Sequence, residues 1–587
     1  MAKVRDTIPH RLLRQAIDRP AAPAYQAKEA GRWQVTTYRQ YADQVRTAAR
    51  ALITLGFPAG GKVAILGFNR PEWLILDVAA MMAGGAPAGI YTTCSPAQIQ
   101  YIVHHSEAHV ILVENETLLA RVLAKRDEMP LCKYIVLMKG AGRTSDTAAG
   151  ILTWDDFLAR GRETPDATLD ARINALEPDG LATLIYTSGT TGPPKGVMLS
   201  HDNLAWTARM LVDVGDGKDT DVGLSYLPLA HIAEQMATIH DPITAGGSTW
   251  FAESIEKVPE NLKESRPTIF FGVPRIWEKF HAGMTGKLGQ LTGPKAKLVA
   301  WARATNTKVN QLRDRGAPIP LALQLQYRLA ARLVIDRLKA AIGFDRARTL
   351  ISGAAPIAPD VLEFFQSIDL PIREIYGQSE DSGPTSFNMP GRTRIGTVGP
   401  SLPGIECKIA EDGEIVVRGP NVFLGYYKEP AATAEALVDG WLHTGDLGAF
   451  DAQGFLSITG RKKEIIITAG GKNIAPKNIE AALKQSPVIG EVVVIGDRRK
   501  FLTALVTLAD GVALAPEAAR AAVQTQLDAV NPTLSRVEQV KRFAILGRPF
   551  GIDTGELTPT LKIKRKVVAE NFASEIEAMY AGEERDA

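Results

Sequence analysis

The chain has 587 residues, of which 45% are hydrophobic and 22% are charged, so it has the composition of a folded globular protein and not of a disordered one. Because domains usually span roughly 100–200 residues, several domains or subdomains are expected. The formal net charge is only +2, which provides no overall electrostatic footprint for nucleic acid, and no nucleic-acid partner is expected.

The cysteines and the apolar runs bear on the compartment. Cys94, Cys132 and Cys407 are widely separated and show neither CxxC spacing nor a disulfide framework, which favours a reducing cytoplasm. The first residues contain no apolar run of signal-peptide length, and no uninterrupted apolar stretch reaches about 18 residues. We therefore expect a cytoplasmic protein without a membrane span.

The N-terminal part of the chain alternates helical and strand-like segments. Thr37 and Gln40 have the spacing of a capping box, apolar residues follow at helical spacing, and Gly56 stands where a C-cap glycine belongs. A helix is expected to begin near Pro71, and the apolar segment 73–90 predicts a buried helix followed by a strand. This alternation indicates a layered α/β domain. Further strand-like runs are residues 63–66, 110–113 and 134–138.

A loop rich in glycine and hydroxyl side chains follows an apolar run of strand length at 181–186. Its sequence is Thr187-Ser-Gly-Thr-Thr-Gly-Pro-Pro-Lys195. Small residues let backbone N–H groups approach an anion, hydroxyls donate further hydrogen bonds, and the lysine adds positive charge. It is not a Walker A loop, because Gly196 and not Ser or Thr follows the lysine. We interpret it as a phosphate cradle; the alternative is an ordinary polar turn.

Residues 281–343 lack the α/β alternation and are expected to be mostly helical and strongly basic. Only Asp314 and Asp336 oppose the basic side chains there. A solvated helical face is the favoured interpretation, and contact with a membrane surface or an anionic partner is the alternative. The basic residues are Lys287, Lys295, Lys297, Arg303, Lys308, Arg313, Arg315, Arg328, Arg332, Arg337 and Lys339.

The pattern changes again near residue 460. Residues 464–468 are strand-like, Pro476–Leu483 is helical, and 491–495 and 501–508 are strand-like again. This order predicts a small α+β domain of ordinary size. We therefore divide the chain into an N-terminal domain at 1–460 and a C-terminal domain at 461–587.

The segment YTSGTTGPPKGVMLSH, from Tyr186 to His201, resembles the signature of the adenylate-forming superfamily of acyl-CoA synthetases, peptide-synthetase adenylation domains and luciferases. The resemblance extends from about residue 30 to about residue 570, and further motifs follow in the family's order. It implies an α/β fold with a large N-terminal adenylation domain of several subdomains and a smaller, mobile α+β C-terminal domain. ATP, Mg²⁺ and coenzyme A are the implied cofactors and co-substrates.

The resemblance also assigns the phosphate and metal sites. The first threonine of the loop, Thr187, would bind Mg²⁺, and Glu380 of the aromatic-Gly-x-Thr-Glu element would be the second metal ligand. Carboxylate and hydroxyl oxygens suit this ion. Around the phosphates the family would place Ser188, Gly189, Thr190, Thr191, Gly192 and the catalytic Lys195.

The nucleoside would be bound by three further motifs. Tyr376 would stack on adenine, with Gly377, Gln378 and Ser379 beside it. In the element Thr-Gly-Asp446, the carboxylate would accept hydrogen bonds from both ribose hydroxyls, and Arg461 would also contact the ribose. The segment following Ser352 resembles the adenine-pocket loop, although by itself a plain turn is an equal alternative. Its members are Gly353, Ala354, Ala355 and Pro356.

Two lysines concern the mobile domain. Lys463 falls at the family's hinge by register; many members have aspartate there, and a solvated charge run is the alternative. The catalytic lysine of the family usually follows glycine, which is missing here. The variant Lys562-Ile-Lys-Arg resembles the long-chain fatty acyl-CoA synthetase branch and selects Lys562, with Lys564 as the alternative.

The acyl site would be formed by residues 227–235 and 271–279, which resemble segments of long-chain enzymes. In the family His231 lies beside the substrate carboxylate and Gly272 lines the same region; alone, such a histidine is usually a core residue. We therefore predict a medium- to long-chain fatty acid–CoA ligase, cytoplasmic or peripheral at the inner membrane face. The alternatives are a fatty acyl-AMP ligase that loads a carrier protein and a non-catalytic nucleotide-binding protein.

Overall fold

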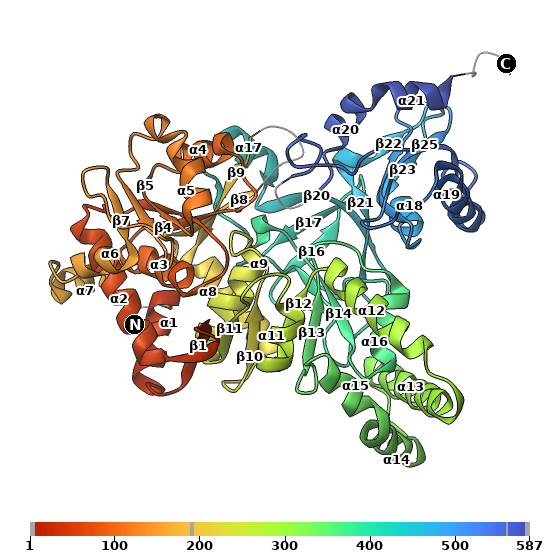
Figure 1. The fold of residues 1–587 in the computed structure, drawn as a ribbon, viewed down its shortest axis with the longest axis horizontal. Coiled ribbons are helices and arrows are strands. Elements are labelled where there is room, and N and C mark those ends of the chain that lie inside the picture. The colour runs from red at the N-terminus through yellow and green to blue at the C-terminus, as the bar shows by residue number, and fades with distance from the viewer. Residues whose placement is uncertain (1–5, 188–192, 559–561, 582–587) are drawn as a thin grey trace.

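The computed structural model describes residues 6–187, 193–558 and 562–581, and Figure 1 shows their arrangement. The N-terminal subdomain is built on a mixed sheet of eight strands, in which the pairs from β8 to β7 are parallel and the pairs β8–β9 and β9–β18 antiparallel. In spatial order these strands are β18 (Gly425–Tyr426), β9 (Lys195–Ser200), β8 (Leu181–Thr187), β4 (Ala86–Ile90), β3 (Lys62–Leu66), β5 (Ala108–Val113), β6 (Tyr134–Leu137) and β7 (Ile151–Thr153).

Both faces of this sheet are covered by helices. In β3, Val63 and Ile65 join one apolar core with α2 (Tyr38–Thr54) and α3 (Pro71–Met82), whereas Ala64 and Leu66 join another with α4 (Pro96–His105) and α5 (Glu116–Leu123). Alternate side chains of a strand point to opposite faces, so a strand buried on both sides is apolar throughout. The expected helix at Pro71 and strands at 63–66, 110–113 and 134–138 are confirmed.

The capping box expected before α2 is also present. The Thr37 hydroxyl accepts from the Gln40 N–H at 3.3 Å, and the Gln40 side chain accepts from the Thr37 N–H at 2.9 Å. Gly56, just beyond the helix, has a φ of 81°, which is the left-handed conformation of a C-terminal cap. Local sequence therefore fixes both ends of this helix.

Three further sheets complete the large domain. In one, β12, β13 and β14 are parallel, so the chain leaves their carboxyl ends at the same edge. Ligands of α/β sheets bind at such edges. The sheets are β10 (Val222–Ser225), β11 (Ser248–Phe251), β1 (Pro23–Glu29) and β2 (Arg32–Thr37); β12 (Ile269–Gly272), β13 (Thr349–Ser352), β14 (Ile372–Tyr376) and β15 (Ser386–Phe387); and β16 (Glu406–Ile409), β17 (Glu414–Arg418), β20 (Trp441–Phe450) and β19 (Leu437–Val438), with β21 (Leu456–Arg461) paired to β20.

The C-terminal part is a small α+β domain with apolar cores of its own. The helix at Pro476–Leu483 is confirmed, but the strand expected over 464–468 is wrong in extent: Lys462–Glu464 is a 3-10 turn, and only Ile466–Ile467 pairs with β23. The elements are β22 (Ile466–Ile467), β23 (Asn473–Ile474), α18 (Pro476–Leu483), β24 (Ile489–Ile495), β25 (Leu502–Leu508), α19 (Pro516–Val530), β26 (Val540–Ile545), α20 (Arg565–Asn571) and α21 (Ala573–Tyr580).

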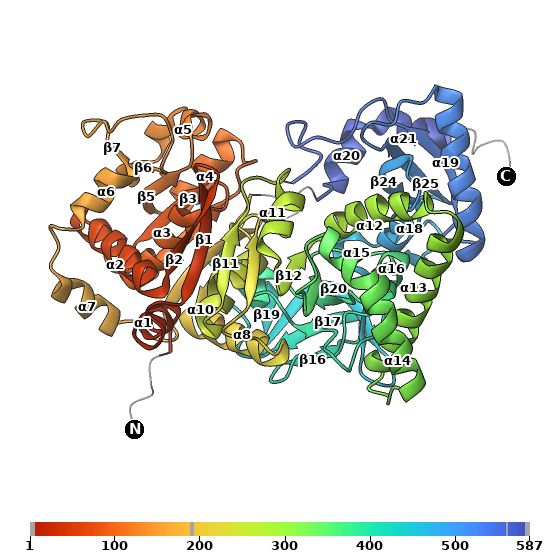
Figure 2. The same cartoon turned by 60° about the horizontal axis from the view of Figure 1, so that its bottom comes forward.

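A group of helices lies outside the β12–β15 sheet, as Figure 2 shows. It consists of α12 (Pro274–Gly289), α13 (Gly293–Asp314), α14 (Leu321–Ala330), a π-helical turn at Ala331–Ile335 and α15 (Asp336–Ala341), which confirms the helical expectation for this basic segment. Among the described residues, no helix is both long and apolar enough to cross a membrane. Together, these layers confirm the expected α/β class with a large and a small domain.

Candidate active site

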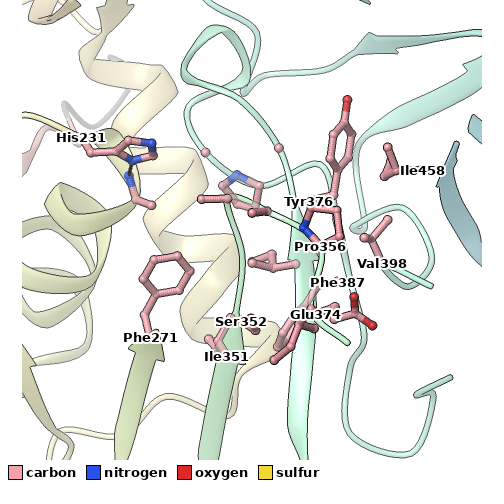
Figure 3. Close-up of a pocket in the computed structure, with 18 of the residues that line it drawn as sticks. His231, Phe271, Ile351, Ser352, Pro356, Glu374, Tyr376, Phe387, Val398 and Ile458 are labelled. Atoms are coloured by element: carbon pink, nitrogen blue, oxygen red, sulfur yellow. Dashed lines mark hydrogen bonds between the residues drawn. The ribbon is translucent and has the colours of Figure 1, made fainter. Parts of the chain in front are cut away.

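A cavity of about 1300 Å³ lies at the carboxyl edge of β12–β14 and extends to the C-terminal domain. Most of the residues selected from the sequence line it, and they come from segments between Thr187 and Lys562. Those lining residues are Thr187, His231, Ala354, Ala355, Pro356, Tyr376, Gly377, Gln378, Ser379, Glu380, Asp446, Arg461 and Lys562. Figure 3 shows His231 and Phe271 at one side of this cavity and Tyr376 with Pro356 at the other.

The side of Tyr376 is formed by the turns after β13 and β14. Ala354 has a φ of 69°, a conformation unusual for a residue with a side chain, and Ala355 and Pro356 follow it along the cavity wall. Gly353 is not a lining residue; a Cβ there would lie 2.7 Å from Ile375 Cγ2. Small residues in this segment allow a planar base to approach the backbone closely.

Gly377 is fixed by a close backbone approach. A Cβ at this position would lie 1.5 Å from the carbonyl oxygen of Gly383, so no other residue fits without moving the backbone. The turn keeps Tyr376, at the end of β14, and Glu380, in a 3-10 turn at Ser379–Asp381, on the cavity wall.

The carboxylate of Asp446 lies at the centre of a hydrogen-bond network. Its Oδ2 accepts from the Tyr376 hydroxyl at 2.8 Å and from Gln378 Nε2 at 2.6 Å, and its Oδ1 is 2.9 Å from Arg461 Nε. A carboxylate offers about four acceptor positions, so these donors leave little capacity for a vicinal diol. A bound ribose would therefore replace at least one of these donors. The Tyr376 hydroxyl is the candidate, because Tyr376 is also the residue expected to stack on the base.

Glu374 is a cavity residue that the sequence reasoning missed. It lies on β14, two residues before Tyr376, and strand periodicity directs both side chains to the same face. Burial raises the pKa of its carboxyl to about 7, and its Oε2 has no hydrogen-bond partner among the described residues. The sequence did offer one indication of this placement, because Glu374 is an acidic residue two positions before Tyr376 on the same strand. The residue lines the cavity on the side of Tyr376.

The phosphate end is described only in part. Ser188, Gly189, Thr190, Thr191 and Gly192 lie outside the described residues, whereas Thr187 and Lys195 face each other as paired residues of β8 and β9. Lys195 does not line the cavity; its Nζ lies 4.8 Å from the ring centre of Tyr426.

Tyr426 connects this lysine to Glu380. The Tyr426 hydroxyl donates to Glu380 Oε1 at 2.9 Å, so a neutral donor holds this carboxylate, and Glu380 forms no ion pair within the described part of the chain. Thr187 and Glu380 both line the cavity and supply the hydroxyl and carboxylate oxygens that Mg²⁺ prefers when phosphate and water provide the rest. Within the described ranges no cluster of three or more His, Cys, Asp or Glu could hold a metal ion.

His231 lies at the start of a short helix, α9 (Ile232–Gln235). Its Nδ1 accepts from the Ala233 N–H at 3.2 Å, so the neutral ring carries its proton on Nε2. Burial, and to a lesser degree the charge of Lys562, lower the pKa of this histidine to about 4. It is therefore a neutral hydrogen-bond donor near pH 7.

Behind His231, the carboxyl of Glu234 holds the surrounding segments together. It accepts from Asn69 Nδ2, Ser225 Oγ and Thr238 Oγ1 at 2.9–3.1 Å, and burial raises its pKa to about 8. The cavity continues past these residues along an apolar wall that includes Phe271. Gly272, which was expected to line this region, does not line the cavity and packs against the Trp277 indole. Other apolar lining residues are Leu211, Val212, Leu224, Met236, Ala237, Ala245 and Ile269.

The C-terminal domain contributes Lys562. Lys562 is an exposed residue that lines the cavity, and desolvation by the surrounding protein lowers the pKa of its ammonium, assisted by the charges of Arg461 and Lys477. The Thr558 hydroxyl accepts from the Lys562 N–H at 2.9 Å. Lys564 is not a lining residue and instead precedes α20 as its N-cap.

Comparisons with known proteins agree with this arrangement. Residues 12–427 match the model of the AMP-binding enzyme family, and residues 463–584 match that of the AMP-binding enzyme C-terminal domain. The chain belongs to the AMP-binding enzyme family. The superfamily suggested by the motif at Tyr186–His201 is thereby confirmed.

Three relatives illustrate the breadth of this AMP-binding family. The long-chain-fatty-acid–CoA ligase ACSBG2 of Xenopus laevis is 39% identical over 95% of this chain and 81% of its own length. The long-chain-fatty-acid–CoA ligase FadD15 of Mycobacterium bovis is 38% identical over 96% of this chain and 95% of its own. The crystal structure of ATP-bound MatB from Rhodopseudomonas palustris has a TM-score of 0.69 and 25% identity, covering 97% of this chain and 99% of that one.

Proposed function

We propose that this AMP-binding enzyme is an ATP-dependent fatty acid–CoA ligase for medium- to long-chain acids. It would first form acyl-AMP and pyrophosphate, then transfer the acyl group to coenzyme A and release AMP. The observation that carries the proposal is one cavity in which an apolar wall, a neutral histidine, a nucleoside-type site and a lysine of the C-terminal domain adjoin. The names of the full-length relatives support the substrate class.

In the first half-reaction, a carboxylate oxygen of the acid attacks the α-phosphorus of ATP, and the bond to pyrophosphate breaks. Catalysis of such a step depends on positioning and charge neutralisation. Lys562 would contact the carboxylate and the α-phosphate, while the Nε2–H of His231 would orient the carboxylate without adding a charge. Tyr376 and Glu374 would bind the base, and Asp446 with Arg461 the ribose.

The proposed metal ligands are Thr187 and Glu380. When bound there, Mg²⁺ would neutralise phosphate charge. Ser188, Gly189, Thr190, Thr191, Gly192 and Lys195 would surround the departing pyrophosphate. In support of this role, the Tyr426 hydroxyl donates to Glu380 Oε1, and no hydrogen bond to Oε2 is made by the residues that the structure describes.

In the second half-reaction the thiolate of coenzyme A attacks the acyl carbonyl, and AMP leaves with the bonding electrons. Lys562 occupies the cavity in this structure, so the domain that carries it would have to turn away to admit the thiol. We place the hinge at Lys463 and the domain division at 460/461. In support, β21 ends at Arg461 and the Lys463 ammonium makes only an exposed 3.7 Å pair with Glu435 among the described residues.

The test is a panel of saturated acids of increasing length with ATP, Mg²⁺ and coenzyme A. Loss of free thiol together with acyl-CoA formation supports the ligase. Accumulation of acyl-AMP with untouched thiol would instead identify an acyl-AMP ligase for a carrier protein. Absence of acid-dependent pyrophosphate release at every length would identify a non-catalytic nucleotide-binding protein.

Peripheral membrane contact through residues 281–343 is part of the same proposal.

A further inference from the structure

The outer face of α14 exposes a row of leucines at the edge of the molecule. Figures 1 and 2 both show this helix at the periphery, beside α13. Leu321, Leu325, Leu329 and Leu333 are 79%, 66%, 51% and 41% exposed. They recur every four residues through α14 and the following π-helical turn, so they form one continuous apolar stripe. We call these four residues the leucine stripe.

The opposite side of α14 explains why the stripe faces outward. Ala330 and Val334 are buried against Ala302 of α13, and the Tyr327 hydroxyl donates to Asp369 Oδ2 at 2.9 Å. The guanidinium of Arg313 also lies 4.6 Å from the Tyr327 ring centre. The helix is therefore fixed by its inner face, which leaves the leucines on the outer face.

The segment that carries the leucine stripe is strongly basic. Residues 281–343 contain eleven basic and two acidic side chains, whereas the whole chain has a net charge of only +2. Only Arg313 and Lys339 pair with a carboxylate among the described residues, both with Asp369. Arg328 and Arg332 lie between the leucines on the exposed face of the helix and have no ion pair within the described ranges.

We propose that α14 docks this enzyme on an anionic lipid surface, with the leucine stripe inserted among the acyl chains and the arginines on the headgroups. An interfacial helix needs this combination of apolar face and basic flank. A protein partner or a second copy would need complementary acidic groups, and α13–α15 offer only Asp314 and Asp336 to a copy of themselves. Charge complementarity therefore favours the membrane.

The location also suits the substrate. The same helical group borders the active-site cavity, because Glu278, His281 and Ala282 of α12 line it. This inference deepens the membrane contact of the proposed function but does not depend on the ligase chemistry. Vesicle binding is measured without ATP, so failure of docking and failure of catalysis are distinguishable.

The experiment is co-sedimentation of the full chain with vesicles of phosphatidylcholine, with and without phosphatidylglycerol. The wild type should bind the anionic vesicles more tightly, and binding should weaken with salt. Leu325→Ser with Leu329→Ser should reduce the affinity by about tenfold for each leucine removed. Arg328→Glu with Arg332→Glu should reduce it at least about tenfold on anionic vesicles alone.

The matched control is Leu131→Ser with Leu514→Ser, which removes two leucines of 46% and 41% exposure elsewhere. These variants should bind like the wild type, and all variants should activate octanoate at the wild-type rate. Vesicle binding that is absent in the wild type, or unchanged in the leucine variant, overturns the proposal. A wild-type dimer that the leucine variant converts to a monomer, without vesicle binding, would reassign the stripe to contact between copies.

Discussion

Arg461 Nε lies 2.9 Å from Asp446 Oδ1, and the two residues are also paired across β20 and β21. The carboxylate is almost fully buried, whereas the guanidinium is partly exposed at the end of the last strand before the C-terminal domain. One ion pair thus connects the expected ribose site with the chain segment that leads to Lys562. Substitution of either residue should therefore weaken nucleotide binding more than it lowers the stability of the fold.

Asp446→Asn should raise KM for ATP at least about tenfold, because a hydrogen bond to a charged group contributes about 1.5–3 kcal/mol. Steady-state kinetics at saturating acid measures this effect. The control is Asp451→Asn, which changes a partly exposed carboxylate in the turn between β20 and β21 that pairs with Arg394. An unchanged KM for ATP in Asp446→Asn would remove this residue from the nucleotide site.

Lys562→Ala should slow acyl-AMP formation by at least about a hundredfold while leaving ATP affinity near the wild-type value, because the side chain would act on charge that develops in the transition state. Rapid-quench measurement of pyrophosphate separates the two effects. Lys564→Ala is the matched control, since that lysine does not line the cavity. The reverse result would assign the reaction to Lys564.

Gly377→Ala should disrupt the Tyr376–Glu380 turn, since the new Cβ would lie 1.5 Å from the Gly383 carbonyl oxygen. Overpacking of this kind costs about 1–3 kcal/mol or more. Both the thermal midpoint and kcat/KM for ATP should fall. Gly286→Ala, on α12 with no atom within 4 Å of the added Cβ, should change neither. Equal behaviour of the two variants would show that the turn tolerates rearrangement.

His240 is buried without a partner for either ring nitrogen among the described residues, and burial lowers its pKa to about 3. In the unfolded chain its pKa is about 6.5, so the unfolded state binds the proton first as pH falls. Stability from the neutral ring is therefore complete above about pH 6.5 and is lost progressively toward pH 3. Between pH 7 and pH 5 this single group should lower the free energy of unfolding by about 2 kcal/mol.

His240→Gln tests that expectation through the difference between two pH values and not through stability at one. Urea unfolding should show a smaller loss between pH 7 and pH 5 in the variant than in the wild type. His104→Gln is a suitable control because this histidine is exposed at the end of α4. An identical loss in wild type and His240→Gln would show that the ring is protonated in the folded state.

The sequence predicted those parts of the molecule that depend on local pattern or on contiguous motifs. The capping box at Thr37, the buried helix from Pro71 and the helix at Pro476–Leu483 follow from spacing alone. The motifs containing Tyr376 and Asp446 were each recognised in the sequence. Only the structure shows that the two side chains are joined by a hydrogen bond. The strand expected over 464–468 was wrong in extent because only the two residues of β23 pair with it.

Other features depend on long-range packing that no local pattern records. Tyr426 reaches Glu380 from a two-residue edge strand, and Glu374 acquires its raised pKa only from burial in the assembled cavity. The apolar wall near Val212 and Ala245 is formed by helices whose sequences do not differ from those of ordinary core helices. Such residues become visible only when the sheets are assembled.

The central claim is that one cavity brings a fatty carboxylate to the α-phosphate of ATP beside Lys562. Acid-dependent exchange of labelled pyrophosphate into ATP, measured without coenzyme A, tests it most directly, because exchange requires only the reversible first half-reaction. The account predicts exchange that needs Mg²⁺, increases with the apolar length of the acid and disappears in Lys562→Ala. Exchange that is absent with every acid, or that is independent of acid, would contradict it.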